Sequence, residues 1–268
     1  MTTVTEKRAK FRALHQSGCF VLPNPWDVGS ARLLTYLGFE ALASTSSGHA
    51  WTMGKADYAP SLDDTLTHLA QLCAATDLPV NADFESGFAD APEGVAANVT
   101  RAIATGVAGL SIEDTKVDGK GLHDKAFAVE RVKAARAAID ASGQDVLLVA
   151  RAEILLHDGT RVSEAIDKLV AFADAGADCL FAPGVWGKND IATMVRAVAP
   201  RPVNVLVRGS DMNLAALAEL GVRRISVGGA LARVAWGAVN KAAQTLHAGD
   251  FTGLAGAMPH GELNSIFS

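Results

Sequence analysis

The sequence predicts an α/β protein that folds as one (β/α)8 barrel of the TIM type. Eight short apolar runs alternate with eight or more helical patterns, as expected of consecutive parallel βαβ units. The length of 268 residues suits a single barrel. Polar and charged residues follow the carboxyl ends of the runs, where barrels of this kind place their active sites.

The predicted strands are short runs rich in leucine, valine and other apolar residues. No glycine-rich nucleotide-binding fingerprint follows any of them, which disfavours the open doubly wound sheet that a similar alternation can form. In chain order they cover residues 19–23, 40–45, 79–84, 109–114, 146–153, 179–183, 202–207 and 223–228.

Each predicted strand is followed by a segment whose apolar residues recur at helical spacing. Asp, Ser or Pro opens several of these segments and Gly closes them, which are the usual start and stop signals of helices. Because no linker interrupts the alternation, we expect one domain over 1–268, with a helical tail at about 248–268 that packs on the barrel or reaches a neighbouring subunit. The predicted helices cover 27–38, 61–76, 91–106, 126–143, 161–176, 190–200, 211–221 and 230–249.

Composition argues against several classes of protein. The net charge of −5 and the pI near 5.8, without an evident basic face, disfavour nucleic acid as a partner. No apolar run is long enough to cross a bilayer, and the N-terminus has a charged amphipathic pattern, not that of a signal peptide. Three cysteines, odd in number and set in apolar contexts, indicate reduced thiols. We therefore expect a cytoplasmic protein.

Acidic residues gather at the ends of the third and fourth predicted strands. Asp83 and Glu85 end the third, and Glu113 ends the fourth. Carboxylates that converge on one barrel mouth repel each other, so a cation is expected among them. Oxygen ligands without clustered Cys or His favour Mg²⁺, with Mn²⁺ as the alternative, over zinc.

Two further features suit a small acidic substrate. Arg151 lies in an otherwise apolar strand, and its planar fork matches a carboxylate. The stretch TSSGH at 45–49 offers hydroxyl and backbone N–H donors at a helix or loop start, which can cradle a carboxylate or an oxyanion. Such a site would stabilise an enolate-like charge as it forms.

Structural roles compete with these functional ones for single residues. Arg151 could equally pair with Glu153 or Glu113 inside the barrel. Asp90 precedes a helical pattern and is expected to cap it. Three histidines are expected on helix surfaces: His15, His68 and His247.

Six stretches, taken together, resemble the isocitrate lyase/phosphoenolpyruvate mutase superfamily: ASTSSGHAWTMGKAD, PVNADFESGF, GLSIEDT, ARAE, PVNVLV and ISVGGALARVAWGA, in this order on successive predicted strands. The similarity covers nearly the whole chain. It implies an α/β barrel whose eighth helix is often swapped with a partner subunit, in homodimers or homotetramers. It also implies Mg²⁺-dependent chemistry beside the carboxylate of a small α-keto or α-hydroxy acid, through an enolpyruvate-like intermediate.

Carried over by position, the resemblance assigns roles to single residues. Arg151 would bind a substrate oxygen in catalysis, Asp57 and Asp83 would lie at the metal, and Glu113 would be a further acid there that acts in catalysis. Beside these carried-over roles, the residues themselves place Glu85 near the metal and make His123 or Lys120, in the loop at 114–124, the candidate proton donor when that loop closes. The substrate would be held by Thr45, Ser46, Ser47, Asp57, Arg151 and Asn204.

The loop DTKVDGKGLHD at 114–124 departs from two branches of the superfamily. It lacks the K-[KR]-C-G-H motif of enzymes that cleave isocitrate and methylisocitrate, and the Asn-Ser pair of phosphonopyruvate mutases and hydrolases. We therefore predict a lyase of the mutase-like branch that cleaves a C–C bond. The alternatives are C–P bond chemistry and a non-catalytic, regulatory barrel that binds a keto acid. A Schiff-base aldolase is disfavoured because no lysine lies in a predicted strand.

Overall fold

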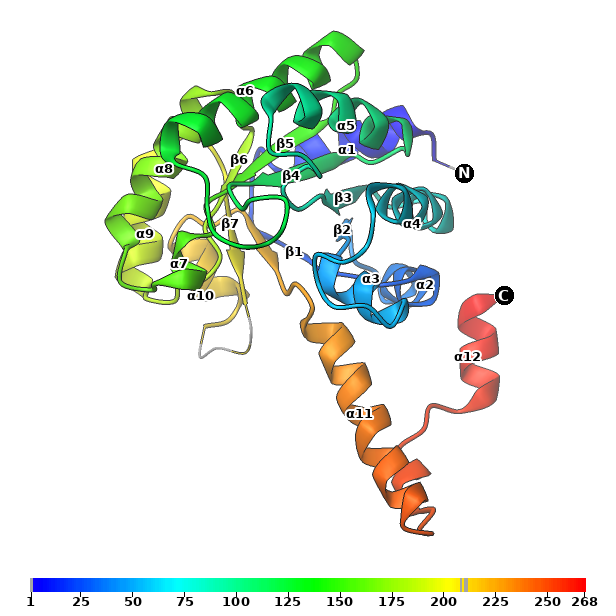
Figure 1. Ribbon diagram of the computed structural model, residues 1–268. Helices are drawn as coiled ribbons and strands as arrows, with labels where there is room; N and C mark the ends of the chain where they lie inside the picture. The colour runs from blue at the N-terminus through cyan, green and yellow to red at the C-terminus, as the bar shows by residue number, and fades with distance from the viewer. Residues whose placement is uncertain (1, 208, 210–211) are drawn as a thin grey trace.

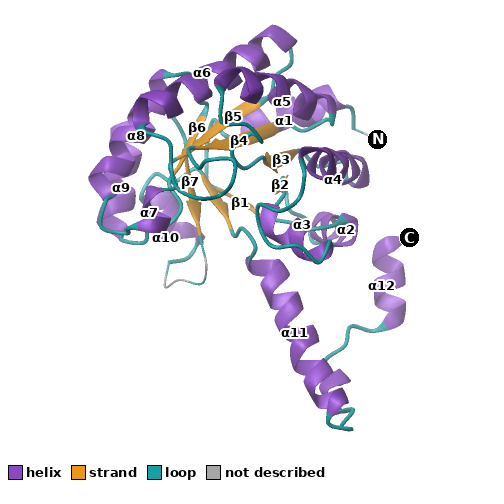
Figure 2. Cartoon of the chain, in the orientation of Figure 1, coloured by secondary structure: helices purple, strands orange, loops and turns teal. Residues whose placement is uncertain are grey.

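The computed structural model describes residues 2–207, 209 and 212–268 and confirms the predicted fold class. Eight parallel strands form a nearly closed barrel that helices surround (Figure 1, Figure 2). Every strand lies inside a predicted run and is shorter than that run. The strands are β1 Phe20–Leu22, β2 Leu42–Ala43, β3 Val80–Asp83, β4 Gly109–Glu113, β5 Leu147–Arg151, β6 Cys179–Phe181, β7 Val203–Leu206 and β8 Arg224–Ser226.

The helices begin and end largely where the sequence signals predict. The side chains of Asp27 and Ser61 cap α2 and α4 in capping boxes, and Gly143 ends α6 in the left-handed conformation. The start of the predicted helix 211–221 lies outside the described residues. The helices are α1 Val4–Leu14, α2 Val28–Tyr36, α3 Ser46–Thr52, α4 Leu62–Ala75, α5 Pro92–Ala104, α6 Lys125–Ser142, α7 Ile154–His157, α8 Val162–Asp174, α9 Lys188–Val198, α10 Leu214–Glu219, α11 Ala230–His247, the 3₁₀ helix η1 Thr252–Leu254 and α12 His260–Phe267.

The barrel is closed between β1 and β2 by side-chain and loop contacts. The paired strands run in the order β1-β8-β7-β6-β5-β4-β3-β2. Beyond this ladder, the Ala43 amide donates to Pro23 O at 3.0 Å. The Asn24 side chain donates to Ser44 O at 2.9 Å and accepts from two backbone amides that follow β8, each at 2.9 Å. Asn24 therefore ties the carboxyl ends of β1, β2 and β8 together.

The two sides of the strands have different chemistry. Outward-facing residues such as Leu110, Leu148 and Val205 are apolar and fully or almost fully buried in the main core. Many inward-facing positions are polar, because alternation sends every second side chain into the barrel. The strand register aligns one inward row across β4 to β8, which consists of Glu113, Arg151, Phe181, Asn204 and Arg224.

Helix α1 closes the amino-terminal end of the barrel. Phe11 is fully buried there in a cluster with Phe20 and Leu22. The expectation that His15 lies on the surface is wrong: it is buried, with Nδ1 2.8 Å from Phe11 O and its ring edge-on to Phe11 and Phe20. Burial, and then the charge of Arg224, lower the pKa of His15 to about 3. The helical pattern places His15 on α1, but only packing reveals which side of α1 meets the barrel.

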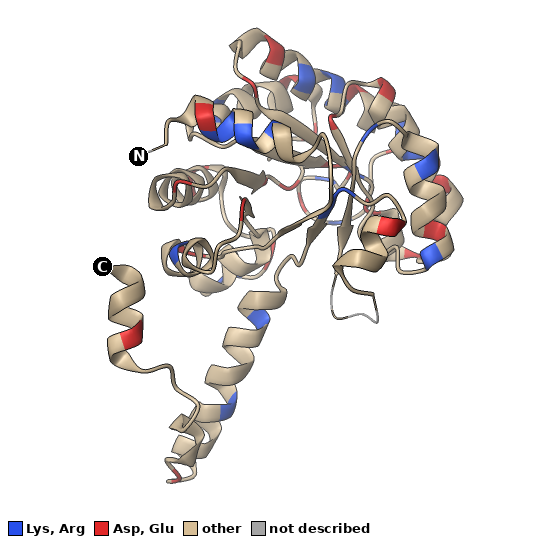
Figure 3. Ribbon diagram, turned by 180° about the vertical axis from the view of Figure 1, so that it is seen from behind, with Lys and Arg blue, Asp and Glu red and all other residues tan. Residues whose placement is uncertain are grey.

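Helix α11 leaves the barrel after β8 and projects away from it, and α12 returns beside α2 (Figure 1). Within α11 only Ala232 is buried. Most of α11 carries no charge (Figure 3). Its exposed apolar side chains include Val234, Trp236 and Val239. Large exposed apolar side chains on a projecting helix suit a contact site.

The cysteines and the helices bear on two further expectations. Cys73 and Cys179 are buried free thiols, and Cys19 is a half-buried free thiol. Among residues 2–207, 209 and 212–268, no helix combines the length and the apolar character needed to cross a bilayer.

We expect His15 to make the fold less stable in acid. A histidine whose folded pKa lies below its unfolded value stabilises the fold above the unfolded pKa and loses this contribution as pH falls toward the folded pKa. Compared with His15→Gln, the wild type should lose ~1.4 kcal/mol of unfolding free energy for each pH unit below about 6.5. Urea unfolding of both proteins at pH 7 and pH 5 measures this difference, and equal losses in the two proteins would contradict it.

Candidate active site

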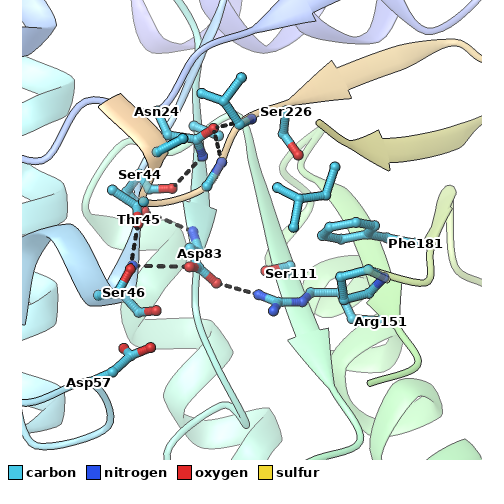
Figure 4. A pocket seen from close by; sticks show the side chains of 18 of the residues that line it. Asn24, Ser44, Thr45, Ser46, Asp57, Asp83, Ser111, Arg151, Phe181 and Ser226 are labelled. Carbon is cyan, nitrogen blue, oxygen red and sulfur yellow. Dashed lines mark hydrogen bonds and ion pairs between the residues drawn. The ribbon is translucent and has the colours of Figure 1, made fainter. Parts of the chain in front are cut away.

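A cavity of about 400 Å³ opens at the carboxyl ends of the strands (Figure 4). Asn24 after β1, residues of β2 to β8 and residues of the loops that follow several of these strands contribute to its wall. Six predicted site residues line it: Thr45, Ser46, Ser47, Asp57, Asp83 and Arg151. Five others do not line it: Glu85, Glu113, Lys120, His123 and Asn204.

Arg151 holds three carboxylates that come from three parts of the chain. Its Nη1 lies 2.6 Å from Asp83 Oδ1, its Nη2 3.0 Å from Glu113 Oε2, and its Nε 2.8 Å from Glu153 Oε1. Burial opposes the positive charge, but the three carboxylates outweigh it and raise the pKa of Arg151. The guanidinium also lies 5.3 Å from the centre of the Phe181 ring. From the sequence, pairing with acids inside the barrel and a place in the substrate site are alternatives for Arg151. In the structure Arg151 does both: it pairs with acids and lies in the cavity wall.

Asp83 links this charged cluster to the hydroxyl-rich segment after β2. The Ser46 amide donates to Asp83 Oδ2 at 3.0 Å, and the Asp83 amide donates to Ser44 Oγ at 2.8 Å (Figure 4). Thr45 caps α3, and its hydroxyl lies 3.2 Å from Ser47 Oγ. The predicted donor-rich segment is therefore present in the cavity wall, although Asp83 occupies one of its amides.

Tyr58 joins Glu113 to the cavity. Its hydroxyl donates to Glu113 Oε1 at 2.7 Å, while its side chain lines the cavity next to the exposed Asp57. Burial and the charge of Glu113 raise the pKa of Tyr58, so the phenol stays protonated and acts as a donor. Sequence reasoning misses Tyr58, and its position directly after Asp57 is the only signal that could have found it.

Glu85 is buried without a positive neighbour of its own. Its side chain is 5% exposed and receives no hydrogen bond from the described part of the chain. It lines a small hollow together with Asp83, next to the cavity. Burial, followed by the charges of Asp83 and Glu113, raises the pKa of Glu85 to about 9. A bound cation would reverse this shift.

The histidines beside Glu85 do not supply the missing charge. The expectation that His68 lies on the surface is wrong, because α4 turns it inward, where it stacks on His49 with ring centres 3.9 Å apart. Burial lowers the pKa of His68 to about 3, so it is neutral at physiological pH. Both rings line the hollow that contains Glu85.

The acidic side chains fit a hard divalent cation. Asp83, Glu85, Glu113 and Glu153 surround or adjoin one guanidinium, that of Arg151, which leaves a surplus of carboxyl groups. Within the described ranges, no three His, Cys, Asp or Glu side chains converge closely enough to hold a metal ion by themselves. Mg²⁺ takes one or two protein carboxylates and completes its octahedron with water and substrate oxygens, so two of these acids would be enough to hold it.

The backbone that carries these acids is strained and is held by a buried arginine. Glu85, Gly87 and Phe88 have φ angles of 47°, 73° and 56°, in the left-handed region that non-glycine residues rarely adopt. Arg131 on α6 is 1% exposed and spans this turn. Its guanidinium donates to the backbone carbonyls of Ser86, Ala89, Asp90 and Glu113.

The loop at 114–124 keeps both predicted proton donors out of the cavity wall. His123 Nε2 lies 3.0 Å from Asp90 Oδ1, and Lys120 is exposed. The expectation that Asp90 caps α5 is wrong: Ala91 occupies the cap position, and Asp90 accepts from the Val117 amide at 2.9 Å. The tight turn after β3 directs Asp90 to the loop, so its carboxylate fastens the loop and not the helix.

Asn204 lies in the barrel interior and not on the wall of the cavity. It is fully buried; its Nδ2 donates to Ser226 Oγ at 2.9 Å, and its Oδ1 accepts from Arg224 Nε at 2.9 Å. Ser226 and Arg224 do line the cavity, so Asn204 orients two lining residues. Sequence reasoning misses Arg224, because a basic pair before an apolar run resembles a solvent-exposed strand start.

Comparison with known proteins matches this chain to enzymes of one family. A family model described as phosphoenolpyruvate phosphomutase matches residues 11–247. A crystal structure from Burkholderia cenocepacia J2315, described provisionally as a lyase/mutase, is 45% identical, has a TM-score of 0.95 and aligns over 98% of this chain and 97% of that one.

Two relatives with named activities are more distant. An oxaloacetate decarboxylase of Paraburkholderia xenovorans is 30% identical over 233 residues, which are 82% of this chain and 74% of the decarboxylase. The structure of an oxaloacetate acetylhydrolase in complex with its product oxalate is 26% identical, with a TM-score of 0.86 over 99% of this chain and 95% of that one.

We expect Arg131→Met to destabilise the protein strongly. It leaves four backbone carbonyls without their donor, which should cost about 3 kcal/mol or more of unfolding free energy. Arg131→Lys, which keeps a donor, should recover part of the loss. Urea unfolding measures both. Arg101→Met, at an exposed arginine paired with Asp63, is the matched control and should change stability by about 0.5 kcal/mol or less. Equal effects at the two positions would overturn the role given to Arg131.

Proposed function

Because the chain belongs to the phosphoenolpyruvate phosphomutase family, within the isocitrate lyase/phosphoenolpyruvate mutase superfamily, we propose that it is a Mg²⁺-dependent lyase that cleaves a carbon–carbon bond in a small 2-oxo or 2-hydroxy carboxylate. The observation that carries this proposal is the surplus of carboxyl groups around Arg151 at the wall of a hydroxyl-lined cavity. The names of two relatives add support, since both refer to reactions of oxaloacetate.

Asp83 would hold the metal ion directly, and Glu85 and Glu113 would hold it directly or through water. When bound, Mg²⁺ polarises substrate oxygens and stabilises the negative charge that develops on them. Glu85, which has no positive neighbour of its own, is the side chain that gains most from a cation beside Asp83.

The remaining wall would bind and orient the substrate. Thr45 and Ser46 offer hydroxyl groups on the side opposite Arg151 (Figure 4), and Ser47 also lines the cavity. Arg151 directs three of the five N–H groups of a guanidinium at carboxylates, which leaves others for a substrate oxygen. Fixed in this way, it would stabilise an enolate without rearrangement during the reaction. Phe181 supplies apolar surface that displaces water.

Tyr58 takes the place of the loop residues as the proton donor in this proposal. His123 and Lys120 do not line the cavity, whereas Tyr58 does and carries its proton on a hydroxyl bonded to Glu113. Glu113, which also contacts Arg151, accepts this proton and fixes the position of the phenol, so the hydroxyl would have to turn from Glu113 toward the substrate to donate it.

We expect Mg²⁺-dependent turnover that Asp83→Asn lowers at least about 100-fold in kcat/KM, because the substitution removes both a metal ligand and a partner of Arg151. The assay covers oxaloacetate, 2-hydroxydicarboxylates and phosphonopyruvate, with Mg²⁺ and with EDTA. Asp63→Asn, at an exposed aspartate on α4, is the matched control and should keep full activity.

The outcomes of this assay separate the alternatives. Turnover of phosphonopyruvate alone would assign the C–P reaction in place of C–C cleavage. Absence of turnover across the panel, with keto-acid binding intact, would favour the non-catalytic barrel and sink the lyase proposal.

The exposed apolar side chains of α11 support a homo-oligomer in which α11 packs on a partner subunit. Val234 and Val239 are 70% and 58% exposed. Replacing both with lysine should lower the mass measured by light scattering to that of a smaller assembly, because charges cannot be buried there without cost. Val170→Lys, at an exposed valine of α8, should leave the mass unchanged. An unchanged mass for the α11 variant would exclude this interface.

A further inference from the structure

Arg224 is a buried cation that no carboxylate neutralises. It lies at the start of β8, points into the barrel and is 3% exposed. Its Nε donates to Asn204 Oδ1 at 2.9 Å, and its Nη1 lies 3.4 Å from Asn81 Oδ1 and 3.4 Å from His15 Nε2. Its guanidinium lies 6.0 Å from the centre of the Phe11 ring. All of these groups are neutral, and no acidic side chain in the described residues forms an ion pair with it.

Two other arginines, the half-buried Arg151 and the buried Arg131, show what Arg224 lacks. Arg151 contacts three carboxylates, and Arg131 donates to four backbone carbonyls. Arg224 uses Nε and Nη1, but its Nη2 has no hydrogen-bond acceptor among the described residues. A buried guanidinium with an unused nitrogen is costly unless something else supplies the acceptor.

The unused nitrogen belongs to a residue that lines the active-site cavity. Arg224 shares this wall with Asp83 and Arg151, and Asn81 and Ser111 also line it. The cavity therefore reaches from the acidic cluster down to the buried cation. Burial lowers the pKa of Arg224, and the charge of Arg151 adds to this effect, so the two guanidinium groups are electrostatic neighbours.

The spacing between the two charged regions suits a short acid. Asn81 contacts Arg224, and Asp83 belongs to the acidic cluster. The two residues are separated by two positions on β3, which is about 7 Å along the strand. An acid held at Asp83 through a metal ion can direct a second carboxylate toward Arg224 over this distance, with hydrogen bonds covering both ends.

We propose that Arg224, with Asn81 beside it, forms a subsite for the second carboxylate of a dicarboxylic substrate. The proposal rests on the proposed function, and it narrows the substrate from a small acid to a dicarboxylate whose far end lies deep in the barrel. It also accounts for the amide at position 81. An aspartate there would form an ion pair with Arg224 and occupy the place of the substrate carboxylate.

The competing explanation is that Arg224 only braces the barrel floor. In that case it serves Asn204, His15 and Phe11, and any loss of affinity after substitution affects monocarboxylates and dicarboxylates alike. The subsite requires that only the second carboxylate be affected.

The test compares malate with 2-hydroxybutyrate, which differ in whether the fourth carbon is a carboxylate or a methyl group. Calorimetric titration of each into the full chain with Mg²⁺ gives affinities without requiring turnover. Asn81→Asp is the main variant, because it is nearly isosteric and places a carboxylate at the position of the Asn81 amide, 3.4 Å from Arg224 Nη1. Arg224→Met removes the charge. Asn189→Asp, at an exposed position on α9, controls for added negative charge.

In the wild type we expect malate to bind at least about 10-fold more tightly than 2-hydroxybutyrate, as one charge-assisted pair allows. Asn81→Asp and Arg224→Met should each remove most of this preference and change 2-hydroxybutyrate binding by about 2-fold or less. Asn189→Asp should behave as the wild type. If Arg224→Met does not fold, Asn81→Asp alone decides the question.

Three results would overturn the subsite. The first is an equal affinity of the wild type for both acids, and the second is a preference that survives Asn81→Asp. The third is binding of formate that Asn81→Asp abolishes without any preference for malate, which would make the site one for a free small anion. These outcomes are independent of turnover. A preference for malate without catalysis would retain the subsite and reject the lyase. Catalysis without a preference for malate would retain the lyase and reject the subsite.

Discussion

One largely enclosed guanidinium organises the carboxyl end of this barrel. Arg151 reaches Asp83, Glu113 and Glu153 within 3.0 Å, so a single charge fixes three segments that are distant in the sequence. Three carboxyl groups face one cation, and burial raises the pKa of Glu113 and raises that of Glu153 to about 8, so a further positive group would favour their ionised forms. In the proposed function this surplus would favour a bound cation, and the fixed guanidinium would supply preorganised charge for an enolate.

The same alternation that builds the acidic cluster also separates it from the basic floor. Asn81 and Asp83 lie on one face of β3, one facing Arg224 and the other facing Arg151. The neutral amide at 81 keeps the lower cation without an internal partner, whereas Arg151 above it has three. The barrel interior therefore has an excess of acidic groups near its mouth, around Arg151, and deeper inside a cation, Arg224, without an ion-pair partner among the described residues. This arrangement suits a metal near the mouth and an anionic group below it.

Residues outside the cavity hold this arrangement in place. Lys168 Nζ lies 2.6 Å from Asp114 Oδ2, and Asp114 Oδ1 accepts from the Glu153 amide at 2.8 Å, so a fully buried pair fixes the segment that carries Glu153. Arg131 does the same for the strained turn at 85–88 by binding backbone carbonyls. Strain of this kind persists only where surrounding contacts determine the backbone, as these two cations do.

The sequence by itself determined the barrel and the place of its active site. Period-two apolar runs separated by helices specify parallel strands, and polar residues at their carboxyl ends, such as Asp83 and Arg151, must then meet at one mouth. Only the tertiary structure decided how side chains pair: Tyr58 with Glu113, Arg224 without a carboxylate, and His123 with Asp90 outside the cavity. The sequence pattern indicates which face of a helix or strand is apolar. Burial and hydrogen bonding of single side chains depend on segments that come together from distant parts of the chain.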